Sequence, residues 1–176
     1  MDIIERGVVR HVPKEELESY QGVVNYLPHL VAHNLKSKSM LIRIVFDASR
    51  SKGGGPSLND LLAKGPDRYL NNLAALVTAF RDGRFLAQGD LKKMFNAVKL
   101  QEADWFVQFF LWRNMDENAD PETYQVVRNN MGVKRSGSIS WTALDLSADK
   151  YVEKYPSTAQ QLKDKSYVND LGVTDE

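Results

Sequence analysis

Two acidic residues stand at the ends of predicted strands: Asp90, in the run GDLKKMF, and Asp170, which closes the run YVND. Asp90 is predicted to end a strand that begins at Arg84, and Asn169-Asp170 to form the tip of a hairpin. Two converging carboxylates hold divalent cations, whose charge stabilises in-line attack on a phosphate, and Mg²⁺ suits such oxygen ligands. From these residues alone the alternative stays open that each Asp is a cap or turn residue.

Other common chemical motifs are absent from the sequence. The three glycines Gly53–Gly55 lack the Lys-Ser/Thr of a phosphate-binding P-loop, and Asp47-Ala48-Ser49 is not the Asp-Ser/Thr-Gly of an aspartic protease. His29 and His33 have no third ligand beside them, so we do not expect a metal site there. The chain has no cysteine, which excludes disulfides, thiolate zinc sites and cysteine nucleophiles.

Strands and helices that would position the two acids interleave irregularly along the chain. Short apolar or β-branched runs predict strands at Met40–Phe46, Trp105–Trp112 and Tyr124–Val127, and the last two should pair as a hairpin with a long polar turn. Gly22–Pro28 is predicted to be extended, because Pro28 disfavours a helical conformation at the residue before it. Helices are predicted where a proline–acid start, a capping box or a spacing of three and four occurs: Pro13–Tyr20, one opening at Ser57 with Asp60, Tyr69–Arg81, and Ser136–Tyr151 closed by Pro156. The interpretation is an α+β fold with an antiparallel-rich sheet.

The two longer helices should each bury one face. In Tyr69–Arg81, which Asp82-Gly83 should end, the expected apolar face is Leu70, Leu73, Leu76, Val77 and Phe80. In Ser136–Tyr151 it is Ile139, Ala143 and Leu146, with Lys150 at its rim.

Composition is that of an ordinary globular chain of 176 residues, 43% hydrophobic and 26% charged. Basic and acidic residues balance at 23 each, so the overall charge does not predict attraction to nucleic acid. The segment Asn34–Pro56 is locally basic and is either a phosphate-facing surface or a solvated face; its charged residues are Lys36, Lys38, Arg43, Arg50 and Lys52 against Asp47. No apolar run approaches the roughly 20 residues of a membrane helix, and the N-terminus does not resemble a secretion signal. We therefore expect an intracellular protein with no membrane partner.

Four blocks of sequence, in this order, resemble the reverse-transcriptase domain of Pao/BEL-type retrotransposons: Ile42–Pro66, Gly89–Val98 (GDLKKMFNAV), Met131–Gly137 (MGVKRSG) and Tyr167–Asp170 (YVND). Four ordered blocks are far more specific than any one. The resemblance implies a right-hand polymerase of fingers and palm, an RNA-directed DNA polymerase that acts on an RNA or DNA primer–template and deoxynucleoside triphosphates. Residues 1 to about 88 would be mainly fingers with the start of the palm, and about 89–176 palm with a fingers insertion.

The resemblance also assigns roles to individual residues. Asp90 corresponds to the first metal ligand of the palm, and Asn169-Asp170 to the second acidic pair, with two Mg²⁺ ions expected between Asp90 and Asp170. Phe95 corresponds to the aromatic that lies under the sugar of the incoming nucleotide and excludes a 2′-hydroxyl. Arg43 corresponds to a triphosphate clamp, since its planar fork suits phosphate oxygens, and Gly132 belongs to the loop that positions template and nucleotide.

The sequence departs from the family pattern at its chemical centre. The fourth block usually reads Tyr-x-Asp-Asp, and Asn169 replaces the first of the two acids, so one of three negative charges is missing. Gly137 stands where proline is common, which loosens that loop. A thumb and a ribonuclease H domain are expected to be absent, and the palm hairpin to keep an open edge.

Two functions follow as alternatives: an impaired polymerase, or a non-catalytic nucleic-acid-binding or interaction remnant of one. We expect little or no primer extension with Mg²⁺ and a trace with Mn²⁺, and we do not expect Asn169→Asp alone to restore efficient synthesis.

Overall fold

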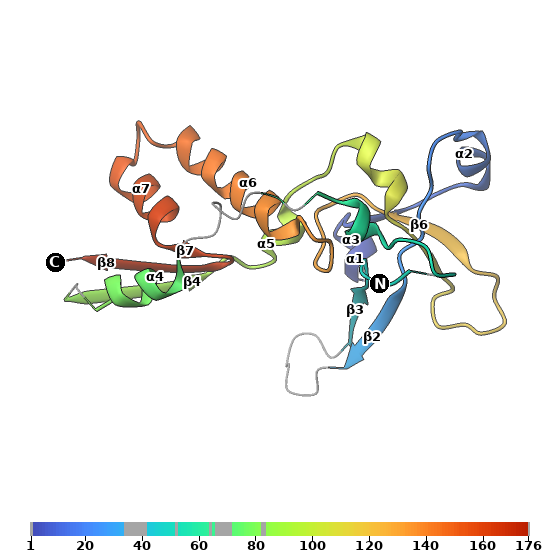
Figure 1. Ribbon diagram of the computed structural model, residues 1–176, viewed down its shortest axis with the longest axis horizontal. Helices are drawn as coiled ribbons and strands as arrows, with labels where there is room; N and C mark the ends of the chain where they lie inside the picture. Colours follow the sequence, from blue (N-terminus) through green and yellow to red (C-terminus); the bar gives the residue numbers. More distant parts are fainter. Residues whose placement is uncertain are drawn as a thin grey trace. The chain divides into compact units, whose positions relative to one another are not determined.

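The chain folds into two compact units, each built from two separate stretches of sequence. In the computed structural model, unit 1 comprises Met1–Ala63 and Lys99–Ser136, and unit 2 comprises Lys64–Val98 and Gly137–Glu176. The structure describes residues 2–33, 42–51, 53–63, 65, 72–81 and 84–175. Figure 1 shows the elements of both units along the chain.

Unit 1 contains a three-stranded antiparallel sheet in the order β1-β6-β5 and a separate two-stranded ladder of β2 and β3. The strands are β1 (Val9–His11), β2 (His29–His33), β3 (Ile42–Phe46), β5 (Phe109–Trp112) and β6 (Glu122–Val126). The helices are short: α1 (Asp2–Glu5), α2 (Lys14–Ser19), α3 (Leu58–Leu61) and the 3₁₀ helix η2 (Glu102–Val107).

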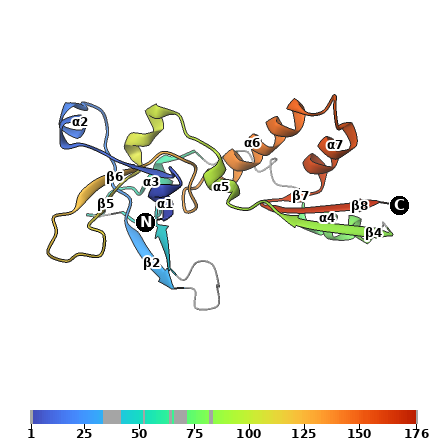
Figure 2. The same ribbon diagram turned by 180° about the vertical axis from the view of Figure 1, so that it is seen from behind.

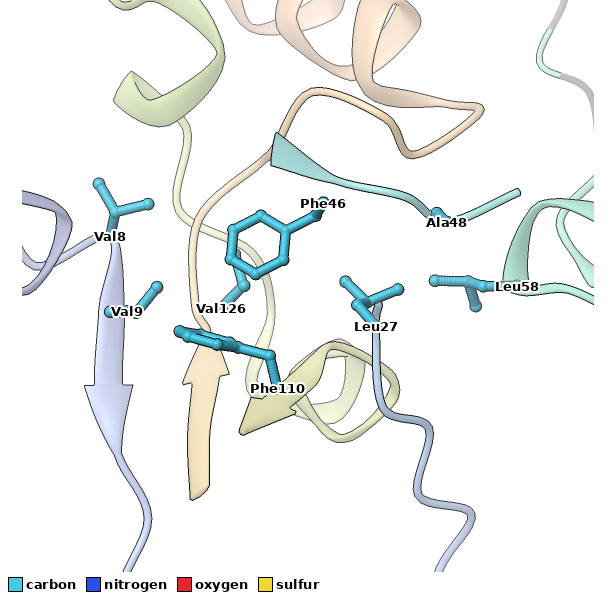
Figure 3. Close-up of a cluster of buried hydrophobic side chains, with 8 residues drawn as sticks. All are labelled: Val8, Val9, Leu27, Phe46, Ala48, Leu58, Phe110 and Val126. Carbon is cyan, nitrogen blue, oxygen red and sulfur yellow. The ribbon is translucent and has the colours of Figure 1, made fainter. Parts of the chain in front are cut away.

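A hydrophobic cluster joins the ladder of unit 1 to its sheet. Phe46, at the end of β3, lies edge-on to Phe110 of β5, with 4.9 Å between the ring centroids. The other members surround this pair in Figure 3: Val8, Val9, Leu27, Ala48, Leu58 and Val126. All eight side chains are buried, so this cluster fixes where β3 ends and where the following turn begins.

Unit 2 is built on a three-stranded antiparallel sheet in the order β4-β8-β7. Its strands are β4 (Phe85–Asp90), β7 (Ser166–Tyr167) and β8 (Asp170–Asp175), and they lie side by side in both views of the chain (Figures 1 and 2). Its helices are α4 (Leu73–Ala79), α5 (Met94–Ala97), α6 (Ser136–Lys150), whose first residue is assigned to unit 1, and α7 (Pro156–Asp164).

Helix α7 is tied to α6 by charge and to the sheet by a hydrogen bond. Lys163 of α7 lies 3.2 Å from Asp145 and 2.5 Å from Asp149 of α6. The pKa of Lys163 is raised, first by its hydrogen bond to Asp149 and further by Asp145. The Ser166 hydroxyl donates to the backbone oxygen of Leu162, which connects the end of α7 to β7. Helix α7 is thereby fixed to α6 on one side and to the start of β7 on the other.

Gly172, in the middle strand of unit 2, leaves room for the ring of Phe80 at the end of α4. A Cβ atom at position 172 would lie 1.9 Å from Cζ of Phe80, whereas one at Gly89 of the neighbouring strand would meet none of the described atoms within 4 Å. Gly172→Ala is therefore expected to lower the free energy of unfolding by about 1–3 kcal/mol through overpacking. Urea unfolding of Gly172→Ala and Gly89→Ala tests this contact; equal effects of the two variants would show that Phe80 does not occupy the space over Gly172.

The predicted mixture of helices with an antiparallel-rich sheet is confirmed: every strand pair in the described residues is antiparallel. The helix α2, the strand β4 and the hairpin of β5 and β6 lie where the sequence predicts them. Ser57 and Asp60 form a capping box, and the Ser57 hydroxyl and backbone N–H lower the pKa of Asp60. None of the helices among the described residues is long and apolar enough to cross a membrane.

Several boundaries and buried faces differ from the prediction. Trp105–Val107 is not strand but the end of η2, because Glu102 and Asp104 favour the start of a helical turn. Between Gly22 and Pro28, where the sequence predicts an extended segment, the only β-bridge in the described residues joins Tyr26 to Phe109. Pro156 opens α7 rather than ending a region, since proline fits the first turn of a helix.

The predicted apolar faces of α4 and α6 are wrong in detail. Leu73 is 51% exposed and Val77 44%, because α4 is only seven residues long and buries Leu76 alone. Leu146 of α6 is 63% exposed, and the buried positions are the small residues Ser136, Ser140 and Ala148. Parts of several predicted segments lie outside the described residues: Met40, Leu41, Tyr69–Asn71 and Asp82-Gly83, as do Lys36, Lys38 and Lys52 of the basic segment.

Candidate active site

The structure brings Asp90 and Asp170 together on paired strands. Asp90 is the last residue of β4, Asp170 is the first residue of β8, and the two are Cα partners in the antiparallel register. Directly opposed residues of antiparallel strands point to the same face, with Cα atoms roughly 4.5–5.5 Å apart. Tyr167 of β7 is the partner of Asp170 on its other side. Both carboxylates are exposed, so they form an accessible acidic pair at one end of the sheet.

Asn169 connects the hairpin tip to the end of β4 by two hydrogen bonds. Its side-chain Nδ2 donates to Oδ1 of Asp90, and its backbone oxygen accepts from the N–H of Leu91 at 2.7 Å. The amide nitrogen, not the amide oxygen, therefore faces the Asp90 carboxylate. This contact satisfies one oxygen of Asp90 without any cation, and it replaces the charge repulsion that a second acid at position 169 would bring.

The tip of this hairpin is Val168-Asn169, not Asn169-Asp170 as the sequence predicts, since Asp170 already pairs with Tyr167 in the ladder. Val168 has φ of 54°, which is a strained value for a β-branched residue. Asn169 is not among the residues with positive φ, so the two-residue tip has the φ pattern of a type II′ turn, whose first position favours glycine. Backbone strain of this kind concentrates at functional sites.

Val168→Gly is expected to raise the free energy of unfolding by about 0.5–2 kcal/mol. The change relieves a strain of about 1–3 kcal/mol at a positive φ, offset by the larger chain entropy of glycine in the unfolded state. Asn169→Gly changes the neighbouring position, which has no positive φ and therefore no strain to relieve. This variant should instead lower the free energy of unfolding, because it removes the hydrogen bond to Asp90. Thermal unfolding of both variants measures the difference, and a stabilised Asn169→Gly would contradict this description of the tip.

The donor set at the tip fits one divalent cation better than two. Asp90 and Asp170 supply two carboxylates on one face, and Mg²⁺ or Mn²⁺ takes such oxygen ligands. Asn169 adds no charge, and its amide would have to turn over before Oδ1 could replace Nδ2 beside Asp90. Among the described residues, no group of three or more His, Asp or Glu side chains gathers anywhere as a metal site. Among the residues that the structure describes, no third acid therefore joins Asp90 and Asp170 to complete a two-ion site.

Phe95 lies in the same unit as the acidic pair, on α5, five residues after Asp90. Its side chain is partly buried, while its neighbour Met94 is buried. Lys93 precedes the helix with φ of 59°, so the chain turns sharply between the end of β4 and α5. A groove of about 350 Å³ runs beside this segment, between it and one face of α6. No motif in the sequence predicts this groove, although the small residues Ser140, Ala143 and Ser147 indicate a closely approached helix face.

Arg43 and Gly132 belong to unit 1. Arg43 lies on β3 opposite Ala32, with its side chain exposed, and alternates with Ile44 and the buried Phe46. Gly132 has φ of 99°, and a Cβ atom there would lie 2.4 Å from the backbone oxygen of Phe46. Arg43 and the Gly132 loop are thus connected through the end of one strand. The role of Arg43 as a triphosphate clamp also predicts that its side chain projects toward the cleft of Asp90, and this stays a prediction, because Asp90 belongs to unit 2.

No family model matches the chain, and no curated protein matches it. The candidate metal site is therefore supported by the residue pattern and by the geometry of Asp90, Asn169 and Asp170.

Proposed function

We propose that the chain is the fingers-and-palm portion of a reverse transcriptase from a Pao/BEL-type retroelement, an RNA-directed DNA polymerase whose metal site is weakened by Asn169. The observation that supports it most is the cross-strand pair of Asp90 and Asp170 at the strained tip of a hairpin. Unit 2, with its antiparallel sheet, corresponds to the palm in this proposal, and unit 1 to the fingers. The interruption of each unit by the other is compatible with a palm that carries a fingers insertion.

The residues of the chain have distinct tasks in this reaction. Asp90 and Asp170 would hold Mg²⁺, which supplies the positive charge that transfer of a nucleotidyl group requires. Phe95 would exclude a 2′-hydroxyl from the incoming nucleotide by filling the space under its sugar. Arg43, an exposed guanidinium on β3, would bind phosphate oxygens through its planar fork. Asn169 contributes no charge and engages Asp90 as a donor, which lowers the affinity of the pair for a cation.

The second candidate function is a non-catalytic nucleic-acid-binding domain derived from such an enzyme. The hydrogen bond from Asn169 to Asp90 favours it, because this bond satisfies the carboxylate without metal. Arg43, near the start of β3, and Arg50, just after the turn that follows β3, are both exposed, and they would contact phosphates in either function.

Single-nucleotide incorporation on a primer–template, run beside a gel-shift assay, separates the two functions. The wild type is expected to bind the primer–template and to add a nucleotide only in trace amounts with Mn²⁺. Asn169→Asp should raise the rate constant of this single addition by about tenfold to a hundredfold, equivalent to about 1.4–2.7 kcal/mol. The double variant Asp90→Asn/Asn169→Asp has the wild-type net charge, and it should remain as inactive as the wild type.

Each outcome of this assay selects one interpretation. Binding without incorporation by Asn169→Asp would favour the non-catalytic domain. Absence of both binding and incorporation would reject both functions. Equal incorporation by Asn169→Asp and the double variant would show that Asp90 is not a metal ligand.

A further inference from the structure

A single side chain of α3, Asn59, bonds to two other segments of unit 1. Its Nδ2 donates to the hydroxyl of Ser49 at 2.8 Å and to the backbone oxygen of Gly132 at 2.9 Å. Its Oδ1 accepts from the backbone N–H of Lys134 at 2.7 Å. The side-chain amide therefore uses both of its polar atoms, and one side chain holds the turn after β3 and both sides of Val133 in the following loop.

Backbone and lysine contacts reinforce the same junction. The Asn59 N–H donates to the oxygen of Ala48 at 2.9 Å, so the start of α3 is fixed on the buried end of β3. Lys134 reaches back with Nζ to the oxygens of Asn59 and Leu62, 3.2 Å from each, where the short helix leaves carbonyls without helical partners. Its charge also lowers the pKa of Asp60, after the two Ser57 hydrogen bonds.

Steric constraints already restrict the path of the loop that Asn59 holds. Gly132 approaches the oxygen of Phe46 so closely that no Cβ fits, and its φ of 99° excludes other residues. Sterics fix where Gly132 lies but not how the next residues leave it. The two bonds from Asn59, to Gly132 O and from Lys134 N–H, fix the direction of the chain over Val133.

We infer that Asn59 is a positioning residue for the nucleotide-binding loop Gly132–Lys134, which it locks to the end of the strand that carries Arg43. The inference rests on the proposed function, because the role of this loop in nucleotide binding does. Asn59 contacts no substrate in this inference; it acts by presenting the loop in one orientation relative to β3. An Asn is suited to the task, since a single amide supplies a donor for one carbonyl and an acceptor for one N–H.

Three variants of the full chain test the inference by amide hydrogen exchange. Asn59→Ala removes every side-chain bond and should speed exchange of the Lys134 N–H by about tenfold or more. Asn59→Asp keeps an acceptor for that N–H but cannot donate to the Gly132 oxygen, which its carboxylate would repel. The Lys134 N–H should therefore stay protected from exchange. Asn25→Ala removes a comparable amide bond in the same unit, from Asn25 Nδ2 to the oxygen of Val107, and should leave Lys134 unchanged.

The positioning role is then tested by measuring the Kd of a fluorescent deoxynucleoside triphosphate in the presence of primer–template. The Kd is expected to rise by about tenfold in Asn59→Ala and to stay at the wild-type value in Asn25→Ala. Unchanged exchange at Lys134 in Asn59→Ala, or equal acceleration in Asn25→Ala, would overturn the inference, and so would an unchanged nucleotide Kd. A wild type that binds no nucleotide would instead reject the proposed function, and the positioning role with it.

Discussion

Asn169→Asp is expected to destabilise the chain in the absence of divalent cations and to make its stability depend on Mn²⁺. The change removes the hydrogen bond that Asn169 donates to Asp90 and places a third carboxylate beside Asp90 and Asp170. Loss of a bond to a charged group and repulsion between like charges together amount to about 1–2 kcal/mol at an exposed site. Thermal unfolding with and without Mn²⁺ measures this, and millimolar Mn²⁺ should restore or exceed the wild-type melting temperature by mass action.

A matched control for this experiment is Asn72→Asp, which adds the same charge within the same unit. Asn72 caps α4 by accepting from the N–H groups of Ala74 and Ala75, and Asp caps helices equally well. The stability of this variant should not depend on Mn²⁺. If Asn169→Asp proved as insensitive to Mn²⁺ as Asn72→Asp, the acidic pair would not be a cation site.

The second large effect is expected at Gly132, where an added methyl group has no space. Gly132→Ala should lower the free energy of unfolding by more than about 2 kcal/mol, because φ of 99° is strained for alanine and the Cβ would lie 2.4 Å from the Phe46 oxygen. That oxygen cannot yield easily, since Phe46 is anchored in the buried cluster of unit 1 (Figure 3).

Gly137→Ala is the control, because it makes the same chemical change a few residues later. Gly137 lies in the first turn of α6 without positive φ, and a Cβ there would meet none of the described atoms within 4 Å. Alanine should leave stability unchanged or raise it by up to about 1 kcal/mol. Denaturant unfolding compares the two variants, and equal midpoints would contradict the close approach of Gly132 to β3.

Local patterns in the sequence predicted the elements that position the acidic pair. The alternation in Arg84–Asp90 and the turn residues after Tyr167 indicate two strand ends, and the structure pairs them as β4 and β8. The exact tip was not predictable, since Asn-Asp has stronger turn propensity than Val-Asn. The ladder places Asp170 opposite Tyr167 and leaves Val168 in the turn, so tertiary register overrides the local preference.

Features that depend on contacts between distant segments could not be predicted. Nothing near Asn59 in the sequence indicates that its amide bonds to Gly132 and Lys134, more than seventy positions away. The exposed Leu73 and Leu146 show the same limit, because periodicity gives the apolar face of a helix but not the surface that covers it. The small residues that α6 does bury carry little hydrophobic signal.

The proposed cation site at Asp90 and Asp170 is tested most directly by a Mn²⁺ titration followed by amide NMR, which locates a paramagnetic ion by the broadening of nearby signals. We expect the signals of Asp90, Asn169 and Asp170 to broaden at the lowest Mn²⁺ concentrations, before those of the acidic loop residues Asp116 and Glu117. Asp90→Asn should abolish this early broadening. Broadening that begins elsewhere, or that persists in Asp90→Asn, would contradict the claim that Asp90 and Asp170 form the cation site of a polymerase palm.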